Sequence, residues 1–232
     1  MYVIGHRGAK GRELENTQPS IARALHDGAD AVEFDLRLTK DKQLVLCHDA
    51  DLSAVSSDNR KIKDLTKAEL QKITLKNGSV PIFFEDALKL TGKSPLYAEL
   101  KDSGSAEILV QKMPLKDRER TAVLSFKHEE LVRVKELVPG ARTYLAHHHN
   151  QFEVVQTARK YGFTGVCINF WLLNPLTYFA AKRFGLTLYV YAVNSLLLGK
   201  FLLTFYPDID ICTDYPDYFR GHPKRSKSSR YA

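Results

Sequence analysis

The chain has 232 residues, of which 44% are hydrophobic and 26% are charged. This balance is ordinary for a folded globular protein and argues against fibrous and disordered classes. A chain of this length forms one large domain or two small ones, because α/β barrels exceed the usual domain size without dividing. The formal net charge is +7. We assign part of that excess to residues 221–232, which are expected to be a solvated, disordered tail.

Net positive charge is weak evidence for nucleic-acid binding here, because no platform of interleaved basic and aromatic side chains accompanies it. The most apolar late segment, SLLLGKFLLTFYP, is interrupted by Lys200 and is shorter than the ~20 residues that a membrane span requires. We therefore predict a helix on the outer wall of the fold, with an unusually apolar face.

Three cysteines, Cys47, Cys167 and Cys212, lie far apart inside apolar runs and form no C-x-x-C pair. This distribution is typical of buried free thiols in a reducing compartment. An apolar strand that begins at Tyr2 leaves no room for a signal peptide before it, so the expected location is cytoplasmic.

The first elements of the chain predict a strand, a helix and a hairpin. The strand ends in Gly5-His6-Arg7-Gly8, a turn whose glycines permit close backbone approach. In NTQPSIARALHDGAD, Thr17 can cap a helix that ends near Gly28. AVEFDLRL and QLVLCHD then read as two strands joined by the polar turn TKDK, and the polar stretch 50–75 is expected to be helix-prone.

The rest of the chain alternates amphipathic helices with apolar strands, which implies parallel βα units. A helix over FFEDALKLTG leads into six strand candidates: LYAEL, TAVLSF, ARTYLA, GVCIN, LTLYVYAVN and IDICTD. They bring the total to nine, and treating QLVLCHD as the return arm of an inserted hairpin leaves eight. We predict a (β/α)₈ TIM barrel over 1–220, with a small insertion after the second strand, roughly over 40–92. An open doubly wound sheet is the alternative, although no G-x-G-x-x-G follows the first strand.

Polar side chains cluster where the predicted barrel strands end, and catalytic groups of such barrels lie there. In chain order they are His6, Arg7, Glu33, Asp35, His48, Glu99 and Lys101. Glu33 and Asp35 are two positions apart in one strand and project from the same face. If that face points to the barrel axis, Glu99 joins them, and the repulsion of three carboxylates is relieved by protonation or by a cation.

A hard divalent ion, Mg²⁺ or Ca²⁺, suits a site of carboxylate oxygens. Zinc suits it less, because no HxxEH-type or cysteine-rich cluster accompanies the carboxylates. Taken alone, the E-x-D pair could equally be a surface or salt-bridged pair, so the metal hypothesis depends on the two carboxylates combining with Glu99 and the strand-end histidines.

The motifs HRG, ENT, E-x-D, TKD, HD and ELK occur in this order, and LYVYAVN and ICTDYP follow near the end. Together they resemble the glycerophosphodiester phosphodiesterase family over most of the chain. The resemblance implies a TIM barrel with an insertion after its second strand. It also implies hydrolysis of glycerophosphodiesters to sn-glycerol 3-phosphate and an alcohol, with one bound Mg²⁺ or Ca²⁺.

Position within these motifs implies a role for each strand-end residue. The acid/base pair is His6 and His48, the metal ligands are Glu33, Asp35 and Glu99, and the phosphate-binding residues are Arg7 and Lys101. Histidine suits the first role because its pKa near ~6.5 allows it to accept or donate a proton at neutral pH. The first step is expected to be attack of the glycerol 2-hydroxyl on phosphorus, and direct attack by water is the competing route.

Further residues are assigned to supporting roles. Glu15 and Asn16 are expected to hydrogen-bond a catalytic group or the metal site, with helix capping as the alternative. Tyr191 is expected to wall the leaving-group pocket. At most one histidine of the run 147–149 is expected to face the site, because adjacent side chains of an extended segment alternate in direction. Asp214 is assigned to the closing turn rather than to substrate.

Two other functions stay open. The first is a lysophospholipase D-like activity on lipids, suggested by Phe170, Trp171, Tyr178 and the apolar late helix. The second is a catalytically silent barrel that binds a phosphorylated ligand, although every residue assigned to catalysis is present. The expected partner is a small glycerophosphodiester, with no nucleic acid, and a membrane contact is not required.

Overall fold

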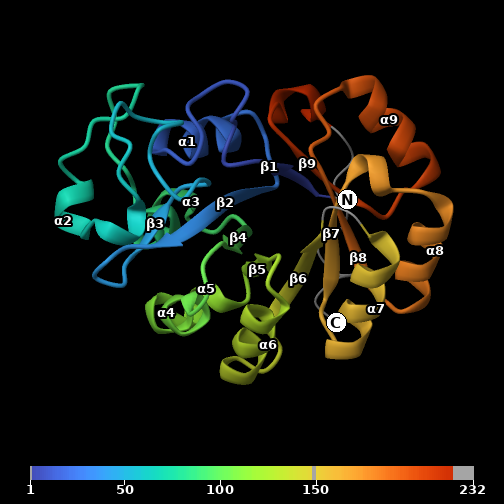
Figure 1. Ribbon diagram of the computed structural model, residues 1–232. Helices are drawn as coiled ribbons and strands as arrows, with labels where there is room; N and C mark the ends of the chain where they lie inside the picture. Colours follow the sequence, from blue (N-terminus) through green and yellow to red (C-terminus); the bar gives the residue numbers. More distant parts are fainter. Residues whose placement is uncertain (1, 148–149, 222–232) are drawn as a thin grey trace.

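The computed structural model describes residues 2–147 and 150–221. Eight parallel strands close into a barrel with helices around it, as Figure 1 shows. The barrel strands are β1 (Val3–Gly5), β2 (Ala31–Leu38), β4 (Leu96–Leu100), β5 (Thr121–Ser125), β6 (Arg142–His147), β7 (Gly165–Asn169), β8 (Thr187–Tyr191) and β9 (Asp210–Thr213). Strand β1 pairs with both β2 and β9, and this pairing closes the ring. The prediction of a (β/α)₈ TIM barrel is therefore confirmed.

The ninth strand, β3 (Leu44–Leu46), lies outside the ring. It pairs antiparallel with the end of β2, with Leu46 opposite Leu36, so the predicted hairpin is confirmed. The expectation of helix over 50–75 is largely wrong, since this stretch holds only η1 (Ile62–Asp64) and α2 (Lys67–Leu70). Its apolar residues fall at irregular intervals, so no helical face extends beyond a turn, and they form a small separate core with Phe83.

Eight helices surround the barrel in the described part of the chain. They are α1 (Gln18–His26), α3 (Phe84–Thr91), α4 (Ser105–Lys112), α5 (Leu115–Arg118), α6 (His128–Leu137), α7 (Gln151–Tyr161), α8 (Pro175–Arg183) and α9 (Leu196–Phe205), with η2 (Phe170–Leu172) and η3 (Pro216–Phe219) beside them. As predicted, the Thr17 side chain caps α1 by accepting a hydrogen bond from the backbone N–H of Ser20. No helix of the described residues combines the length and apolarity needed to cross a bilayer.

The barrel interior is filled below the site by aromatic rings. Tyr97 contacts Tyr144 and Tyr189, with ring centroids 5.6 and 5.3 Å apart. The three cysteines are buried and free, as predicted. Because the lower interior is packed, the open space lies at the carboxyl ends of the strands, where the predicted site residues are.

The proposed unit boundaries, 1–220 for the barrel and 40–92 for the insertion, stay predictions. Helix α3 falls within the proposed insertion but packs against α1 in the main core. The predicted disordered tail, 221–232, lies outside the described residues except for Gly221.

Candidate active site

The turn after β1 has a strained backbone that serves the site. Arg7 has φ +49°, in the left-handed region, and Gly8 has φ +85°. For a non-glycine residue this conformation costs on the order of 1 kcal/mol and needs support from its surroundings. Here the carbonyl of Arg7 accepts hydrogen bonds from the Asn16 N–H (3.0 Å) and the Ser20 hydroxyl (2.8 Å). The turn then directs the Arg7 N–H to a Glu33 carboxylate oxygen, 2.9 Å away.

Three carboxylates converge inside the top of the barrel, as predicted. Strands β2 and β4 are in register, with Asp35 opposite Glu99, and Glu33 lies two residues before Asp35 on the same face. One oxygen from each of the three lies within 4.8 Å of the others. Glu33 and Asp35 are almost fully buried. The barrel thus brings all three predicted metal ligands together.

The three carboxylates have different affinities for a proton. Burial and the neighbouring charges of Asp35 and Glu99 raise the pKa of Glu33 well above its usual range. Burial and the charge of Asp35 likewise raise the pKa of Glu99 to about 7. Burial alone would raise the pKa of Asp35 too, but the cations of Lys101 and Arg7 hold it below its usual range. Two of the three groups therefore resist ionisation in the absence of a cation.

Lys101 and Arg7 lie against these carboxylates. The Lys101 ammonium is 2.9 Å from Asp35 and 2.5 Å from Glu99. The Arg7 guanidinium is 3.1 Å from Asp35 through Nε and 2.8 Å from Glu15 through its terminal nitrogen. Both cations also line the cavity above the carboxylates. They are well placed to meet an anionic ligand that enters from the mouth.

The ENT segment supports this network. Asn16 donates through its amide nitrogen to Asp35 (2.9 Å) and accepts from the Asp35 N–H (3.1 Å). Glu15 pairs with Arg7 and, at 3.2 Å, with Lys10. The residue that caps α1 is Thr17, so Glu15 and Asn16 take the hydrogen-bonding role rather than the capping role.

The donor set fits a hard divalent cation. Carboxylate oxygens are the ligands that Mg²⁺ and Ca²⁺ prefer, and a cation would relieve the repulsion that raises the pKa values of Glu33 and Glu99. Cys167, the one cysteine that lines the cavity, is buried and its pKa is raised, which disfavours the thiolate that zinc would require.

The two predicted catalytic histidines reach the same cavity from different parts of the chain. His48 follows β3, and its Nδ1 lies 2.8 Å from Asp49. Its backbone carbonyl accepts a hydrogen bond of 2.9 Å from Arg37, which fixes the loop. Burial lowers the pKa of His48, so its neutral form prevails near pH 7. A proton shared with Asp49 at Nδ1 leaves Nε2 as the nitrogen that can exchange a proton with a ligand.

His6 has a carboxylate partner that the sequence analysis missed. Its Nδ1 lies 2.6 Å from Asp214, which follows β9. The other oxygen of Asp214 accepts a hydrogen bond of 2.7 Å from the Asn194 amide nitrogen, and the Asp214 N–H donates to the side-chain oxygen Oδ1 of Asn194 at 2.8 Å. Burial alone would raise the pKa of Asp214, but the hydrogen bond from His6 lowers it. The assignment of Asp214 to the closing turn alone was wrong, because ring closure places the end of β9 beside the end of β1.

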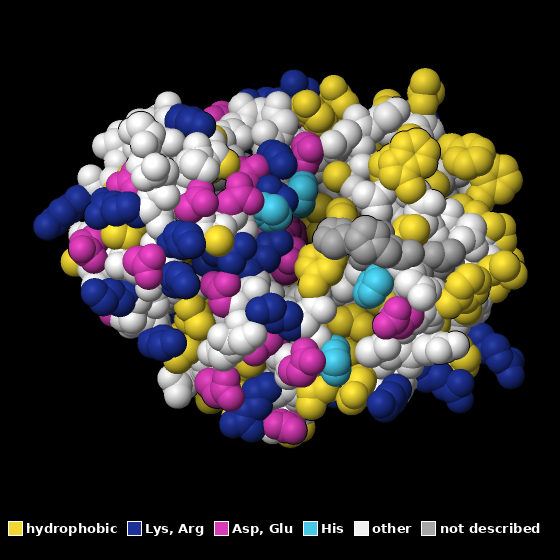
Figure 2. All heavy atoms as spheres, in the orientation of Figure 1, with side chains coloured by type: hydrophobic (Ala, Val, Ile, Leu, Met, Phe, Trp, Pro, Cys, Tyr) yellow, Lys and Arg dark blue, Asp and Glu magenta, His cyan; other side chains and the backbone are white. Residues whose placement is uncertain are grey.

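The cavity has a charged side and an aromatic side, with an empty volume of about 520 Å³ that includes its open mouth. It is lined by His6, Arg7, Glu33, His48, Glu99, Lys101, Leu124, Phe126, Ala146, Cys167, Tyr189 and Tyr191. In Figure 2 two histidines lie among basic and acidic side chains near the centre of the face.

The aromatic residues around the cavity were only partly predicted. Tyr191 lines the cavity as expected, whereas the sequence analysis missed Phe126. Trp171 is 81% exposed and lies outside the cavity. Of the histidine run, only His147 lies within the described residues, at the end of β6.

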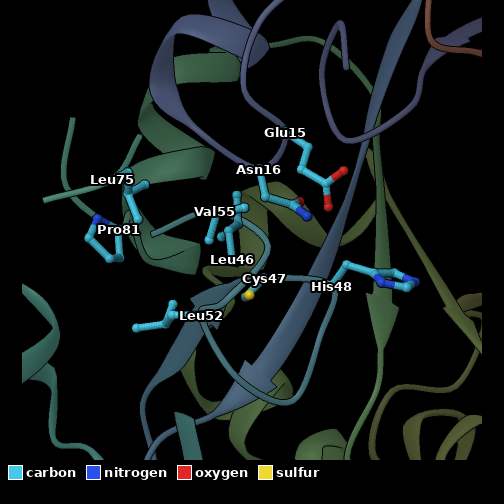
Figure 3. A pocket seen from close by; sticks show the side chains of 9 residues that line it. All are labelled: Glu15, Asn16, Leu46, Cys47, His48, Leu52, Val55, Leu75 and Pro81. Carbon is cyan, nitrogen blue, oxygen red and sulfur yellow. The ribbon is translucent and has the colours of Figure 1, made fainter. Parts of the chain in front are cut away.

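A second, smaller hollow explains how the His48 loop is held. Figure 3 shows it between the ENT segment and the insertion, with Leu75 and Pro81 on one side and Glu15 and His48 on the other. The hollow is too small for a substrate and is mostly apolar. The hollow lies where the small core of the insertion packs against the ENT segment of the barrel.

The raised pKa of Glu99 predicts a pH dependence of stability in the metal-free protein. Between its ordinary value of 4.5 and about 7, the folded protein keeps a proton that the unfolded chain has released. The free energy of unfolding attributable to Glu99 therefore falls as pH rises through this window, by on the order of 1–3 kcal/mol. Thermal unfolding in EDTA from pH 5 to 8 measures this fall, and Glu99→Gln is expected to reduce it. Equal pH dependence in the two proteins would contradict the prediction.

Comparisons with known proteins show which family this chain resembles. The family model described as the glycerophosphoryl diester phosphodiesterase family matches residues 6–115. A Bacillus subtilis (strain 168) protein named "Putative glycerophosphodiester phosphodiesterase YhdW" is 29% identical, over 94% of this chain and 96% of its own length. The crystal structure of a glycerophosphodiester phosphodiesterase from Parabacteroides distasonis superposes with a TM-score of 0.81, at 27% identity over 93% of each chain. Mouse lysophospholipase D GDPD1 is 36% identical, over 43% of this chain and 31% of its own length.

Proposed function

Since this chain belongs to the glycerophosphoryl diester phosphodiesterase family, we propose that it hydrolyses glycerophosphodiesters to sn-glycerol 3-phosphate and an alcohol. The observation that carries this proposal is the convergence of two histidines, three carboxylates and two cations on one cavity. Each group corresponds to a requirement of phosphodiester cleavage: proton transfer at two oxygens, charge neutralisation and a hold on the phosphate.

The two histidines suit opposite ends of the reaction. One ring must accept the proton of the attacking hydroxyl, and the other must donate a proton to the leaving alcohol. Both rings have a carboxylate at Nδ1, Asp214 for His6 and Asp49 for His48, which orients Nε2 for this exchange. The structure favours neither order, so we propose the pair without assigning acid and base.

The phosphate would lie beside Arg7 and Lys101, with Glu33, Asp35 and Glu99 holding one divalent cation, Mg²⁺ or Ca²⁺. When bound, such a cation supplies charge neutralisation to the phosphoryl oxygens. Arg7 offers a planar donor fork and Lys101 a point charge, and both already lie within the cavity. The attacking group that we propose is the 2-hydroxyl of the glycerol, which gives a cyclic phosphate that water then opens.

Release of glycerol 3-phosphate tests this function. We expect release from glycerophosphocholine or another glycerophosphodiester, its loss in EDTA, and recovery with added Mg²⁺ or Ca²⁺. A 2-deoxy analogue of the substrate tests the cyclic route, and undiminished turnover on it would exclude attack by the 2-hydroxyl. No release from any glycerophosphodiester with either ion would refute the proposal as a whole.

A lysophospholipase D-like activity is the second candidate function. The aromatic side of the cavity favours it, since Phe126 and Tyr191 could accommodate part of an apolar chain. A comparison of glycerophosphocholine with lysophosphatidylcholine, at equal concentrations below the critical micelle concentration, separates the two activities.

The three buried thiols suit a reducing compartment, and we propose that the enzyme acts in the cytoplasm.

Asp214→Asn is expected to lower kcat by about 10–100-fold with little change in KM. Asparagine keeps the size of the side chain but can present its amide to Nδ1, which favours the wrong tautomer of His6 and removes the charge that stabilises its protonated form. Steady-state kinetics measure the effect as a fall in kcat at nearly unchanged KM. A parallel loss in kcat and substrate affinity, together with a lowered Tm, would indicate a structural role only.

A further inference from the structure

The wall of the barrel at α8 and α9 exposes an unusual number of large apolar side chains. Six of them form what we name the apolar face: Trp171 (81% exposed), Leu176 (68%), Phe179 (66%), Leu197 (80%), Phe201 (57%) and Phe205 (60%). They come from η2, α8 and α9. Scattered apolar residues are common on protein surfaces, but a group of this size marks an interaction site.

The apolar face is continuous across neighbouring elements and lies beside the mouth of the site. Tyr178 of α8 contacts Tyr206, which directly follows α9, with ring centroids 5.0 Å apart. Phe201 and Phe205, one helical turn apart, contact each other at 4.8 Å. Figure 2 shows the hydrophobic side chains gathered over α8 and α9, on the same side of the molecule as the central histidines. A surface bound there would be close to the entrance of the cavity.

Acidic side chains are scarce in this region. Between Glu153 and Asp208 the chain contains no aspartate or glutamate, and Asp208 itself pairs with Lys182 of α8. Arg183 and Lys200 lie on α8 and α9 as further basic residues. A chain with 27 acidic residues among 232 would ordinarily place some of them in so long a stretch. A face of exposed Trp, Phe and Leu side chains with basic neighbours matches the chemistry of an anionic lipid surface.

We propose that the apolar face docks on an anionic phospholipid membrane, with Trp171, Leu197 and Phe201 entering the interface and Lys200 contacting the headgroups. A second copy of the chain is a poorer occupant. A two-fold interface through this face would bring Lys200 of one copy close to the same positive charge of the other. The docking does not depend on turnover, so it stands or falls apart from the proposed activity.

Vesicle co-sedimentation of the full chain in EDTA tests the docking. The probes are vesicles of phosphatidylcholine alone and of phosphatidylcholine with phosphatidylglycerol. We expect binding to the anionic vesicles, weaker binding at high salt, and at least about tenfold weaker binding for Leu197→Gln with Phe201→Gln. Lys200→Glu should reduce binding to anionic vesicles by roughly tenfold and leave the small affinity for phosphatidylcholine unchanged.

Leu115→Gln is the matched control, because Leu115 is 76% exposed but lies on α5, away from the apolar face. It should bind as the wild type does, and all variants should keep the wild-type Tm. Wild-type protein that ignores anionic vesicles, or a double variant that binds them as well as the wild type, would overturn the proposal. So would a dimer in sedimentation velocity that the double variant dissociates, because the face would then be covered by a second copy.

Discussion

His6→Ala is expected to lower kcat by about 10²–10⁴-fold, the range typical of a lost general acid or base. The imidazole is held between the cavity and Asp214, so alanine removes both the proton carrier and its orientation. His48→Ala should fall in the same range. Because the two rings serve one transition state, the double variant should lose less than the product of the single losses.

Glycerol 3-phosphate release at saturating substrate and cation measures these losses. His26→Ala is a suitable control, because the His26 side chain is 78% exposed and lies on the outer helix α1. The variants should bind Mg²⁺ or Ca²⁺ as the wild type does, since neither histidine belongs to the carboxylate cluster. Full metal-dependent turnover by either variant would remove that histidine from the mechanism.

Glu33→Gln and Glu99→Gln are each expected to reduce turnover on the order of 10³-fold. A cation in this position contributes several kcal/mol of charge stabilisation, and the loss of one charged ligand forfeits most of it. The affinity for the cation should fall in parallel. Removing the repulsion among three carboxylates should at the same time leave the metal-free variants as stable as the wild type or more stable.

Isothermal titration with Mg²⁺ and Ca²⁺, alongside turnover at rising cation concentration, separates weak binding from lost chemistry. Glu129→Gln provides the control, because the Glu129 side chain is 73% exposed on α6 and distant from the cluster. If either glutamine variant bound the cation with wild-type affinity and retained activity, the assignment of Glu33 or Glu99 as a ligand would be wrong.

The features of the fold that depend on local pattern could be predicted from the sequence. Strand AVEFDLRL coincides with β2, and the helix over FFEDALKLTG ends at Gly92, which has the positive φ that glycine tolerates. The hairpin also followed from local pattern, because two strands joined by a short polar turn pair with each other. The convergence of Glu33, Asp35 and Glu99 followed from strand alternation and from the pairing of β2 with β4.

The missed features depend on contacts distant in sequence. The pairing of Asp214 with His6 spans 208 residues and follows only from closure of the ring. Phe126 directly follows β5 and lines the cavity, but in the sequence an apolar residue at a strand end cannot be distinguished from one that packs in the core. The irregular path over 50–75 is fixed by the small core of the insertion, whose apolar residues have neither helical nor strand spacing.

The pairing of β1 with β9 also has a consequence for the order of folding. His6 is among the first residues of the chain to be synthesised, but its partner Asp214 is among the last, so the oriented imidazole cannot exist before the final strand docks. The carboxylates of β2 and β4 can assemble earlier, since these strands are neighbours in the ring. In refolding, the recovery of cation binding should therefore precede the recovery of turnover, and turnover would report the closing of the barrel.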